Sequence, residues 1–280
     1  MGIFDGVLLA SDFDGTLAVT SVSPDGIAAP DRGAIPQRVY DAVNFFISEG
    51  GYFTVCTGRS YQGFPYYDPE LINAPVILCN GSLIYDYPTN TVLMNTGLTM
   101  GCADALRDIH AHFPNAAMEL YGVGKTWCIN LNTLSKDHLE SQRIHYEIIE
   151  DVAQSEAPWP KLMFGSVKEG ITQMQEYIRE HHPQIGFIPT TGRFLEITVP
   201  GSHKGAGLLA LANHLGCKPE HAYAIGDGDN DVDMLVTAAK AFVPSNGSDW
   251  AKAKADYIVC SNAEGAVADA IEILKTIYRK

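Results

Sequence analysis

Short apolar runs, each followed by polar turn residues, divide the first third of the chain. Residues 3–11 form the first run and predict a buried strand, and the runs that begin at Tyr52 and Ala74 predict two more, the last of them ending at Asn80. Between the first two runs lies the segment 36–51, where apolar residues recur at helical spacing between a proline and a glycine pair. Strand, helix and strand with polar turns between them predict a doubly wound parallel sheet.

The pattern changes between residues 85 and 199 and then returns. Helical periods at 101–113 and 168–182 alternate with strand-like runs such as 161–167 and 193–199, which predicts an α+β insert with an antiparallel sheet. We therefore expect an α/β, Rossmann-like core with an inserted α+β domain. The expected core is 1–84 and 200–280, and the expected insert is 85–199.

The last third of the chain supports this division. A helical period spans 202–216, and an apolar run after His221 leads into an acidic turn. Two short strand-like runs follow, and a final helical period covers 265–280. A loop rich in Pro, Gly and Asp at 19–35 is longer than a simple connection, which is typical of a functional loop.

Four polar clusters follow predicted strands or open a predicted helix. They are DFDGT at 12–16, TGRS at 57–60, HKG at 203–205 and GDGDND at 226–231. In a doubly wound sheet the carboxyl ends of the strands meet at one edge, and ligands bind there. Two carboxylates at the end of a buried strand are costly unless a positive group lies against them. The clusters together therefore predict a metal and phosphate site.

Composition narrows the classes of partner. The chain carries 19 basic and 33 acidic residues, a formal net charge of −14, which disfavours general binding to nucleic acid or to an anionic membrane. The 6 cysteines are scattered without a CxxC pair, as expected for buried thiols in a reducing cytoplasm. We find no secretory leader and no apolar run of the ~18 to 20 residues that a membrane span needs, so we expect a cytoplasmic protein.

The four clusters, in this order, resemble the haloacid dehalogenase superfamily of phosphotransferases. The long insert after NGSLIYD resembles the Cof-type branch of that superfamily, which carries a type IIB cap domain. The resemblance covers residues 7–82 and 200–270, and the insert only by position and pattern. It implies a Mg²⁺-dependent phosphatase that forms an aspartyl-phosphate.

The resemblance also implies roles for individual residues. Asp12 would be the nucleophile, Asp14 the general acid and then the base, and Lys204 would hold the phosphate and the nucleophile. Five residues are expected to bind the phosphate or the rest of the substrate: Thr57, Gly58, Arg59, Asn80 and Asn230. For Arg59, a structural ion pair is as reasonable as a substrate contact. Four residues are expected at the metal: Asp12, Asp14 through its backbone carbonyl, Asp227, and Asp231 through water or as a neighbour.

Several alternatives stay open at this point. The expected substrate is a small phosphorylated metabolite, with a sugar phosphate as the favoured class, but a phosphomutase would carry the same clusters. A signalling receiver domain lacks the second aspartate and the insert, and a catalytically silent binding protein would not keep every cluster filled. Arg193, Lys125 and Tyr121 are candidate contacts of the insert with substrate, although surface charge explains them equally well. The oligomeric state is not readable from the sequence.

Overall fold

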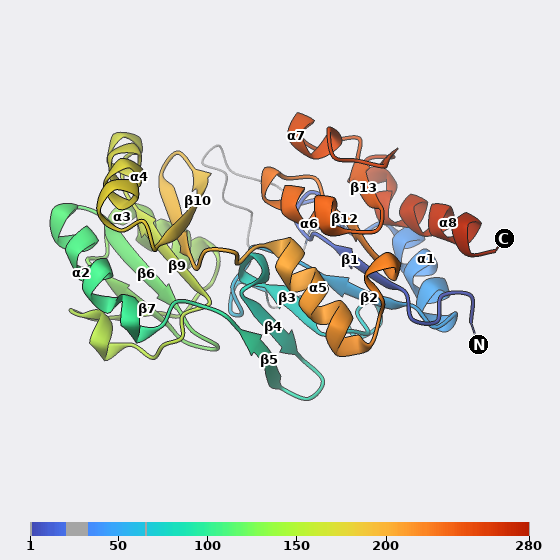
Figure 1. Ribbon diagram of the computed structural model, residues 1–280, viewed down its shortest axis with the longest axis horizontal. Coiled ribbons are helices and arrows are strands. Elements are labelled where there is room, and N and C mark those ends of the chain that lie inside the picture. Colours follow the sequence, from blue (N-terminus) through green and yellow to red (C-terminus); the bar gives the residue numbers. More distant parts are fainter. Residues whose placement is uncertain (1, 21–32, 65, 280) are drawn as a thin grey trace.

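A five-stranded parallel sheet forms the centre of the larger lobe in this computed structural model, which describes residues 2–20, 33–64 and 66–279 (Figure 1). The order of its strands is β14-β13-β12-β1-β2, and every pairing is parallel. Their bounds are Leu8–Ser11 for β1, Tyr52–Val55 for β2, Ala222–Ile225 for β12, Ala241–Pro244 for β13 and Tyr257–Val259 for β14. The predicted α/β fold class is confirmed.

Side chains that alternate along the strands build a hydrophobic cluster on each face of this sheet. Leu9 of β1 packs with residues of α1 (Gln37–Ser48) and α8 (Ala266–Tyr278). Leu8, on the opposite face, packs with residues of α5 (Lys204–Leu215) and α6 (Val232–Thr237). The short helix α7 spans Asp249–Lys252. Helices therefore cover both faces of the sheet, as a doubly wound fold requires.

A small antiparallel sheet adjoins the core at the edge of β2. It has the order β3-β4-β5, with bounds Val76–Leu78 for β3, Leu83–Asp86 for β4 and Thr91–Asn95 for β5. An isolated parallel bridge between Cys56 and Ile77 links β3 to the chain after β2. The turn Cys79–Gly81 then reverses the chain into β4. The third predicted strand therefore ends at Leu78, two residues before the predicted end, and an isolated bridge links it to the chain after β2.

The second lobe is built on a six-stranded sheet with the order β10-β11-β9-β6-β7-β8 (Figure 1). All its pairings are antiparallel except that of β7 with β8. The bounds are Ala117–Tyr121 for β6, Thr126–Ile129 for β7, Glu147–Ile148 for β8, Lys161–Gly165 for β9, Gly186–Thr191 for β10 and Phe194–Thr198 for β11. Residues of α2 (Ala103–His112) and α4 (Lys168–His181) pack on one face, and α3 (Thr133–Ser141) packs on part of the other.

Some expectations need adjustment. The first strand begins at Leu8, not at residue 3, because residues 3–6 form turns in which Gly6 adopts a positive φ. The strand β5 lies inside the predicted insert but pairs with β4, and the boundaries at 84 and 199 stay predictions. Most of the predicted loop 19–35 lies outside the described residues. Among the residues that are described, no helix is long and apolar enough to cross a membrane.

Two glycines allow a test of the turn that ends β3. Gly81 (φ +97°) and Gly6 (φ +76°) share a left-handed backbone, but a Cβ on Gly81 would lie 2.3 Å from the His203 carbonyl oxygen, whereas a Cβ on Gly6 would meet nothing within 4 Å. Gly6→Ala should lower the free energy of unfolding by about 1 kcal/mol through backbone strain alone. Gly81→Ala should lower it by a further ~1 to 3 kcal/mol through overpacking. Equal losses in urea unfolding would contradict the close approach of this turn to α5.

Candidate active site

The candidate site lies where the strand order of the parallel sheet reverses. From β1 the chain leads to β2 on one side, and from β12 it leads to β13 on the other, so the crevice between β1 and β12 is the switch point of the fold. Asp12 directly follows β1, and its backbone N–H donates to the Ile225 carbonyl at 2.9 Å. Asp227 follows β12 by two residues. Two of the predicted clusters therefore meet at the carboxyl ends of neighbouring strands.

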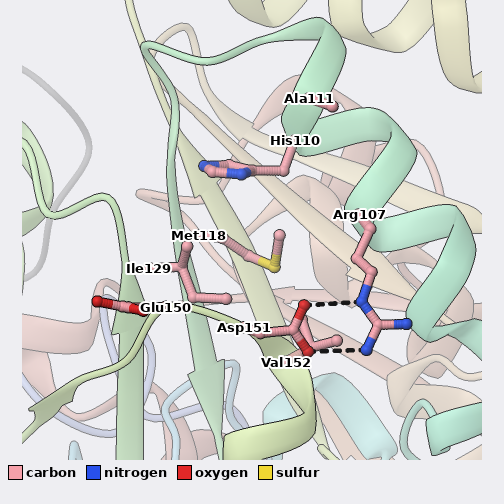
Figure 2. A pocket seen from close by; sticks show the side chains of 8 residues that line it. All are labelled: Arg107, His110, Ala111, Met118, Ile129, Glu150, Asp151 and Val152. Carbon is pink, nitrogen blue, oxygen red and sulfur yellow. Dashed lines mark hydrogen bonds and ion pairs between the residues drawn. The ribbon is translucent and has the colours of Figure 1, made fainter.

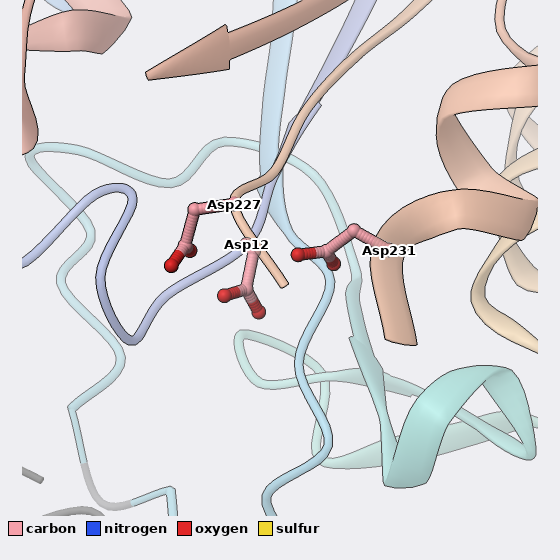
Figure 3. Close-up of side chains that lie close together, drawn as sticks. All are labelled: Asp12, Asp227 and Asp231. Carbon is pink, nitrogen blue, oxygen red and sulfur yellow. The ribbon is translucent and has the colours of Figure 1, made fainter. Parts of the chain in front are cut away.

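Three carboxylates converge at this point (Figure 3). Asp12, Asp227 and Asp231 each place a carboxylate oxygen within 4.8 Å of the other two. Asp231 ends the short turn Asp229–Asp231 before α6 and is fully buried, and Asp12 is only 6% exposed. Carboxylates at this distance and depth repel one another strongly unless positive charge compensates them.

Lys204 supplies one positive charge from the first residue of α5. Its Nζ lies 2.6 Å from Asp12 Oδ1 and 2.6 Å from Asp231 Oδ1, and the side chain is 0% exposed. Burial alone would lower the pKa of Lys204, but the two carboxylates outweigh it and hold the ammonium charged. Burial nevertheless raises the pKa of Asp12 well above its ordinary value, because Lys204 offsets only part of the cost. The positive charge of Lys204 is therefore too small to compensate the three carboxylates.

Asp227 shows the same deficit. Burial raises its pKa to about 6, although the Thr16 hydroxyl donates to Asp227 Oδ1 at 2.5 Å and opposes the rise. A Cβ on Gly15, which has a φ of +82°, would lie 2.5 Å from Asp227 Oδ2, so only glycine leaves room for the carboxylate. Closely set carboxylate oxygens with too little compensating charge fit a hard divalent cation.

Asp14 lies apart from this cluster and is held by Arg59. The guanidinium binds the Asp14 carboxylate in a bidentate ion pair, in which Nε donates to Oδ2 at 2.7 Å and Nη2 donates to Oδ1 at 2.6 Å. Arg59 itself is 5.3 Å from the ring centroids of both Phe13 and Tyr66, which fix its plane. Of the two interpretations that the sequence left open for Arg59, the structure shows the ion pair.

The other predicted substrate-binding residues gather beside the carboxylates. Thr57 is 1% exposed, and its hydroxyl accepts from the Arg59 backbone N–H at 3.2 Å. Asn80 Oδ1 accepts from Asn230 Nδ2 at 3.2 Å and lies where a Cβ on Gly58 would come within 2.9 Å. The structure thus brings all these predicted residues together, and their roles stay predictions.

The sequence interpretation missed residues that support the site from a distance. Asn246 Nδ2 donates to the Gly15 carbonyl at 2.8 Å, which fixes the turn after β1. From the insert, Lys161 Nζ donates to the Gly58 carbonyl at 2.9 Å, and Glu196 Oε1 accepts from Asn80 at 3.0 Å. Glu196 carried one readable signal, because a glutamate between Leu and Ile in an apolar strand needs a partner when buried.

Of the insert residues suggested by the sequence, Tyr121 lies beside the contact of β9 with the core, with Lys161 Nζ 5.8 Å from its ring centroid. Lys125 pairs with Glu156 at 2.7 Å on the surface, and the side chains are 56% and 71% exposed. Tyr121 is buried, and its hydroxyl donates to Glu119. Arg193 is half-buried, and its carbonyl accepts from the Ser166 backbone N–H at 3.0 Å. None of the partners just named belongs to the acidic cluster.

A separate cavity of about 90 Å³ opens in the insert (Figure 2). Arg107 of α2 donates from Nε and Nη2 to Asp151 across one side of it, at 2.8 and 2.7 Å. Met118 lines it and belongs to the hydrophobic cluster between the six-stranded sheet and α2. Its lining includes neither the three carboxylates of the acidic cluster nor Lys161 and Glu196, which contact the core, so the cavity is separate from that cluster.

Comparison with known proteins gives relatives that match along nearly the whole chain. The putative phosphatase YxeH of Bacillus subtilis is 26% identical over 279 residues, which are 95% of this chain and 97% of that one. The pyridoxal phosphate phosphatase YbhA of Escherichia coli is 24% identical over 279 residues, with 94% and 97% covered. A chloroplastic protein of Arabidopsis thaliana, endoribonuclease YBEY, is 40% identical, but over only 45% of this chain and 22% of its own length.

Solved structures share the fold. A haloacid dehalogenase-like hydrolase from Bacteroides thetaiotaomicron has a TM-score of 0.79 at 21% identity and covers 96% of this chain and 99% of that one. A structure described as a sugar phosphatase of haloacid dehalogenase subclass IIB has a TM-score of 0.77 at 20% identity, with the same coverage. These likenesses extend through the insert as well as the core.

The family assignment rests on the sequence match over both lobes. The sequence profile of the haloacid dehalogenase-like hydrolases matches residues 9–271, a span that includes all four polar clusters and the whole six-stranded sheet. The resemblance predicted from those clusters is confirmed. The chain belongs to the haloacid dehalogenase-like hydrolases.

Proposed function

We propose that the protein is a Mg²⁺-dependent phosphatase that hydrolyses a small phosphorylated metabolite through a phosphorylated Asp12. The observation that carries the proposal is the placement of Asp12 at the switch point of the sheet, with one carboxylate oxygen held by a buried lysine. Lys204 occupies Oδ1 and orients the carboxylate, so that its other oxygen is available for attack on phosphorus. A fixed nucleophile with a fixed cation beside it is what phosphoryl transfer requires.

The proposed reaction runs in two steps. Asp12 attacks the phosphorus, the bond from phosphorus to the ester oxygen breaks, and Asp14 gives its proton to that leaving oxygen. Asp14, now a carboxylate, then takes a proton from the water that attacks the aspartyl-phosphate and releases inorganic phosphate. Arg59 fixes where the Asp14 carboxyl group lies through two hydrogen bonds.

The acidic cluster is the proposed place of the metal ion. Asp12, Asp227 and the Asp14 carbonyl would hold Mg²⁺ directly. Both oxygens of Asp231 already have partners, namely Lys204 Nζ and the Gly228 backbone N–H at 2.8 Å, so Asp231 would act through water. When bound, the ion would neutralise the carboxylates and the incoming phosphate.

The insert supports a small substrate. Its β9 and β11 contact the turns at Gly58 and Asn80, beside the acidic cluster, so the leaving group has to fit between the two lobes. The relatives named above include a pyridoxal phosphate phosphatase, and one structural neighbour is described as a sugar phosphatase. We propose a sugar phosphate or a metabolite of similar size as the substrate class.

The first prediction from the proposed function concerns turnover. The wild type should release inorganic phosphate from p-nitrophenyl phosphate and from members of a panel of sugar phosphates and pyridoxal phosphate, with Mg²⁺ and not after its removal. Asp12→Asn should lose at least about a thousandfold in kcat, because no nucleophile remains. Asp233→Asn is the matched control, since Asp233 is exposed on α6 and should keep wild-type rates. Release that survives Asp12→Asn would contradict the mechanism.

The second prediction concerns stability without metal. Because the pKa of Asp227 is raised to about 6 in the folded protein, its contribution to stability is full below its ordinary pKa of 3.8 and is lost as the pH rises through 6. The free energy of unfolding in chelator should therefore fall between about pH 4 and pH 7. Asp227→Asn should flatten this slope, and Mg²⁺ should raise the Tm of the wild type at pH 7 but not of the variant. A slope unchanged in Asp227→Asn would contradict the assignment.

The third prediction concerns the bidentate ion pair between Arg59 and Asp14. Arg59→Lys keeps the charge but loses the two-armed grip on Asp14, so kcat should fall by about 10- to 100-fold. The loss should be greater for alkyl phosphates than for p-nitrophenyl phosphate, whose leaving group needs little help from an acid. Arg38→Lys is the control, because Arg38 makes a surface pair with Asp269 and is 48% exposed. Equal losses on both substrate types would contradict a role through Asp14.

A further inference from the structure

A buried polar contact joins the insert to the turn that follows β3. Glu196 of β11 accepts from Asn80 Nδ2 at 3.0 Å, and the two residues are 1% and 4% exposed. Lys161 of β9 lies beside them, with Nζ 2.9 Å from the Gly58 carbonyl oxygen and 3.5 Å from Glu196 Oε2. Two neighbouring strands of the insert therefore contact two neighbouring turns of the core at a single place.

The geometry of Asn80 leaves its side chain little freedom. Its backbone is left-handed, with a φ of +51°, a conformation that asparagine tolerates better than most residues, and its N–H donates to the Thr57 carbonyl at 3.0 Å. A carboxylate can only accept, so Nδ2 has to face Glu196, and Oδ1 then faces Asn230 Nδ2 at 3.2 Å. Both ends of the amide are engaged, one by the insert and one by the acidic turn.

The contact depends on both lobes. A buried carboxylate without partners costs several kcal/mol, and the partners of Glu196 are Lys161 from its own sheet and Asn80 from the core. Any displacement of β11 relative to the β3 turn removes the Asn80 bond and leaves Asn230 without the acceptor that fixes its amide. The docking of the insert on the core and the position of the Asn230 amide are thus connected through the side chain of Asn80.

We infer that Asn80 is a positioning residue, which transmits the docking of Glu196 to the phosphate-binding residues Asn230 and Gly58. This inference rests on the proposed phosphatase function. It gives Asn80 a role in addition to the expected substrate contact, since each end of its amide already has one protein partner. The insert then does more than enclose the substrate. It holds the core turns that meet the transferring phosphoryl group in their reactive arrangement.

An exchange of the two polar groups tests this role. Asn80→Asp keeps the shape and the left-handed preference but sets a second carboxylate against Glu196, so kcat should fall by about 10- to 100-fold with little change in KM. Glu196→Gln keeps an acceptor for Asn80 and should cost about 3-fold. In the double variant Asn80→Asp, Glu196→Gln, the new amide can donate to the new carboxylate. Its kcat should recover to within about 5-fold of Glu196→Gln.

A second contact between the lobes provides the control. Gln62 donates to Thr126 at 3.1 Å and accepts from the His145 backbone at 3.0 Å, away from Asn80. Gln62→Ala should weaken docking of the insert without displacing Asn230, so its kcat should stay within about 3-fold of wild type. An equal fall of kcat in Gln62→Ala and Asn80→Asp would mean that docking in general matters, and would overturn the specific role of Asn80.

Thermal unfolding of the wild type, the two single variants at positions 80 and 196 and their double variant separates this inference from the proposed function. Coupling between positions 80 and 196 in Tm, with parallel coupling in kcat, is the expected result. The positioning role would be overturned if the fold-losses in kcat of the two single variants simply multiplied in the double variant. It would also be overturned if Tm showed coupling while kcat did not change. If the wild type releases no phosphate from any compound, the proposed function fails. Coupling in Tm would then still report the contact between insert and core, while the positioning role would fall with the function.

Discussion

The buried ammonium of Lys204 between Asp12 and Asp231 is the interaction on which the site depends. Removing one partner of such a group leaves uncompensated charge in the interior and costs about 3 to 5 kcal/mol. The fold places these groups from three separate elements: the end of β1, the start of α5 and the turn before α6. Their convergence therefore requires the parallel register of β1 with β12 and the packing of α5 against the sheet.

The charge balance around Lys204 explains why the site calls for a cation. One lysine faces three carboxylates, and burial raises the pKa of both Asp12 and Asp227. Arg59 does not supply the missing positive charge, because its guanidinium pairs with Asp14 at 2.6 to 2.7 Å. The two cations therefore have separate partners: Lys204 lies against the proposed nucleophile Asp12, and Arg59 lies against Asp14, the residue proposed to move the proton.

Much of this arrangement could be predicted from the sequence, because it depends on local pattern. Asp12 and Asp227 follow apolar runs, and Lys204 opens a helical period, so the topology alone brings them to one edge. Pairings between distant segments could not be predicted in this way. The grip of Arg59 on Asp14 and the bond from Thr16 to Asp227 depend on rotamers and turn geometry. The docking of Glu196 on Asn80 depends on how the two lobes sit together.

The central claim is that Asp12 becomes phosphorylated, and acid quench followed by mass spectrometry tests it most directly. Asp14→Asn is the suitable protein, because p-nitrophenol leaves without a general acid while hydrolysis of the aspartyl-phosphate lacks its base. During turnover of p-nitrophenyl phosphate with Mg²⁺, the account predicts a mass increase of one phosphoryl group on the peptide that contains Asp12. Turnover with no such adduct, or an adduct on a different residue, would contradict it.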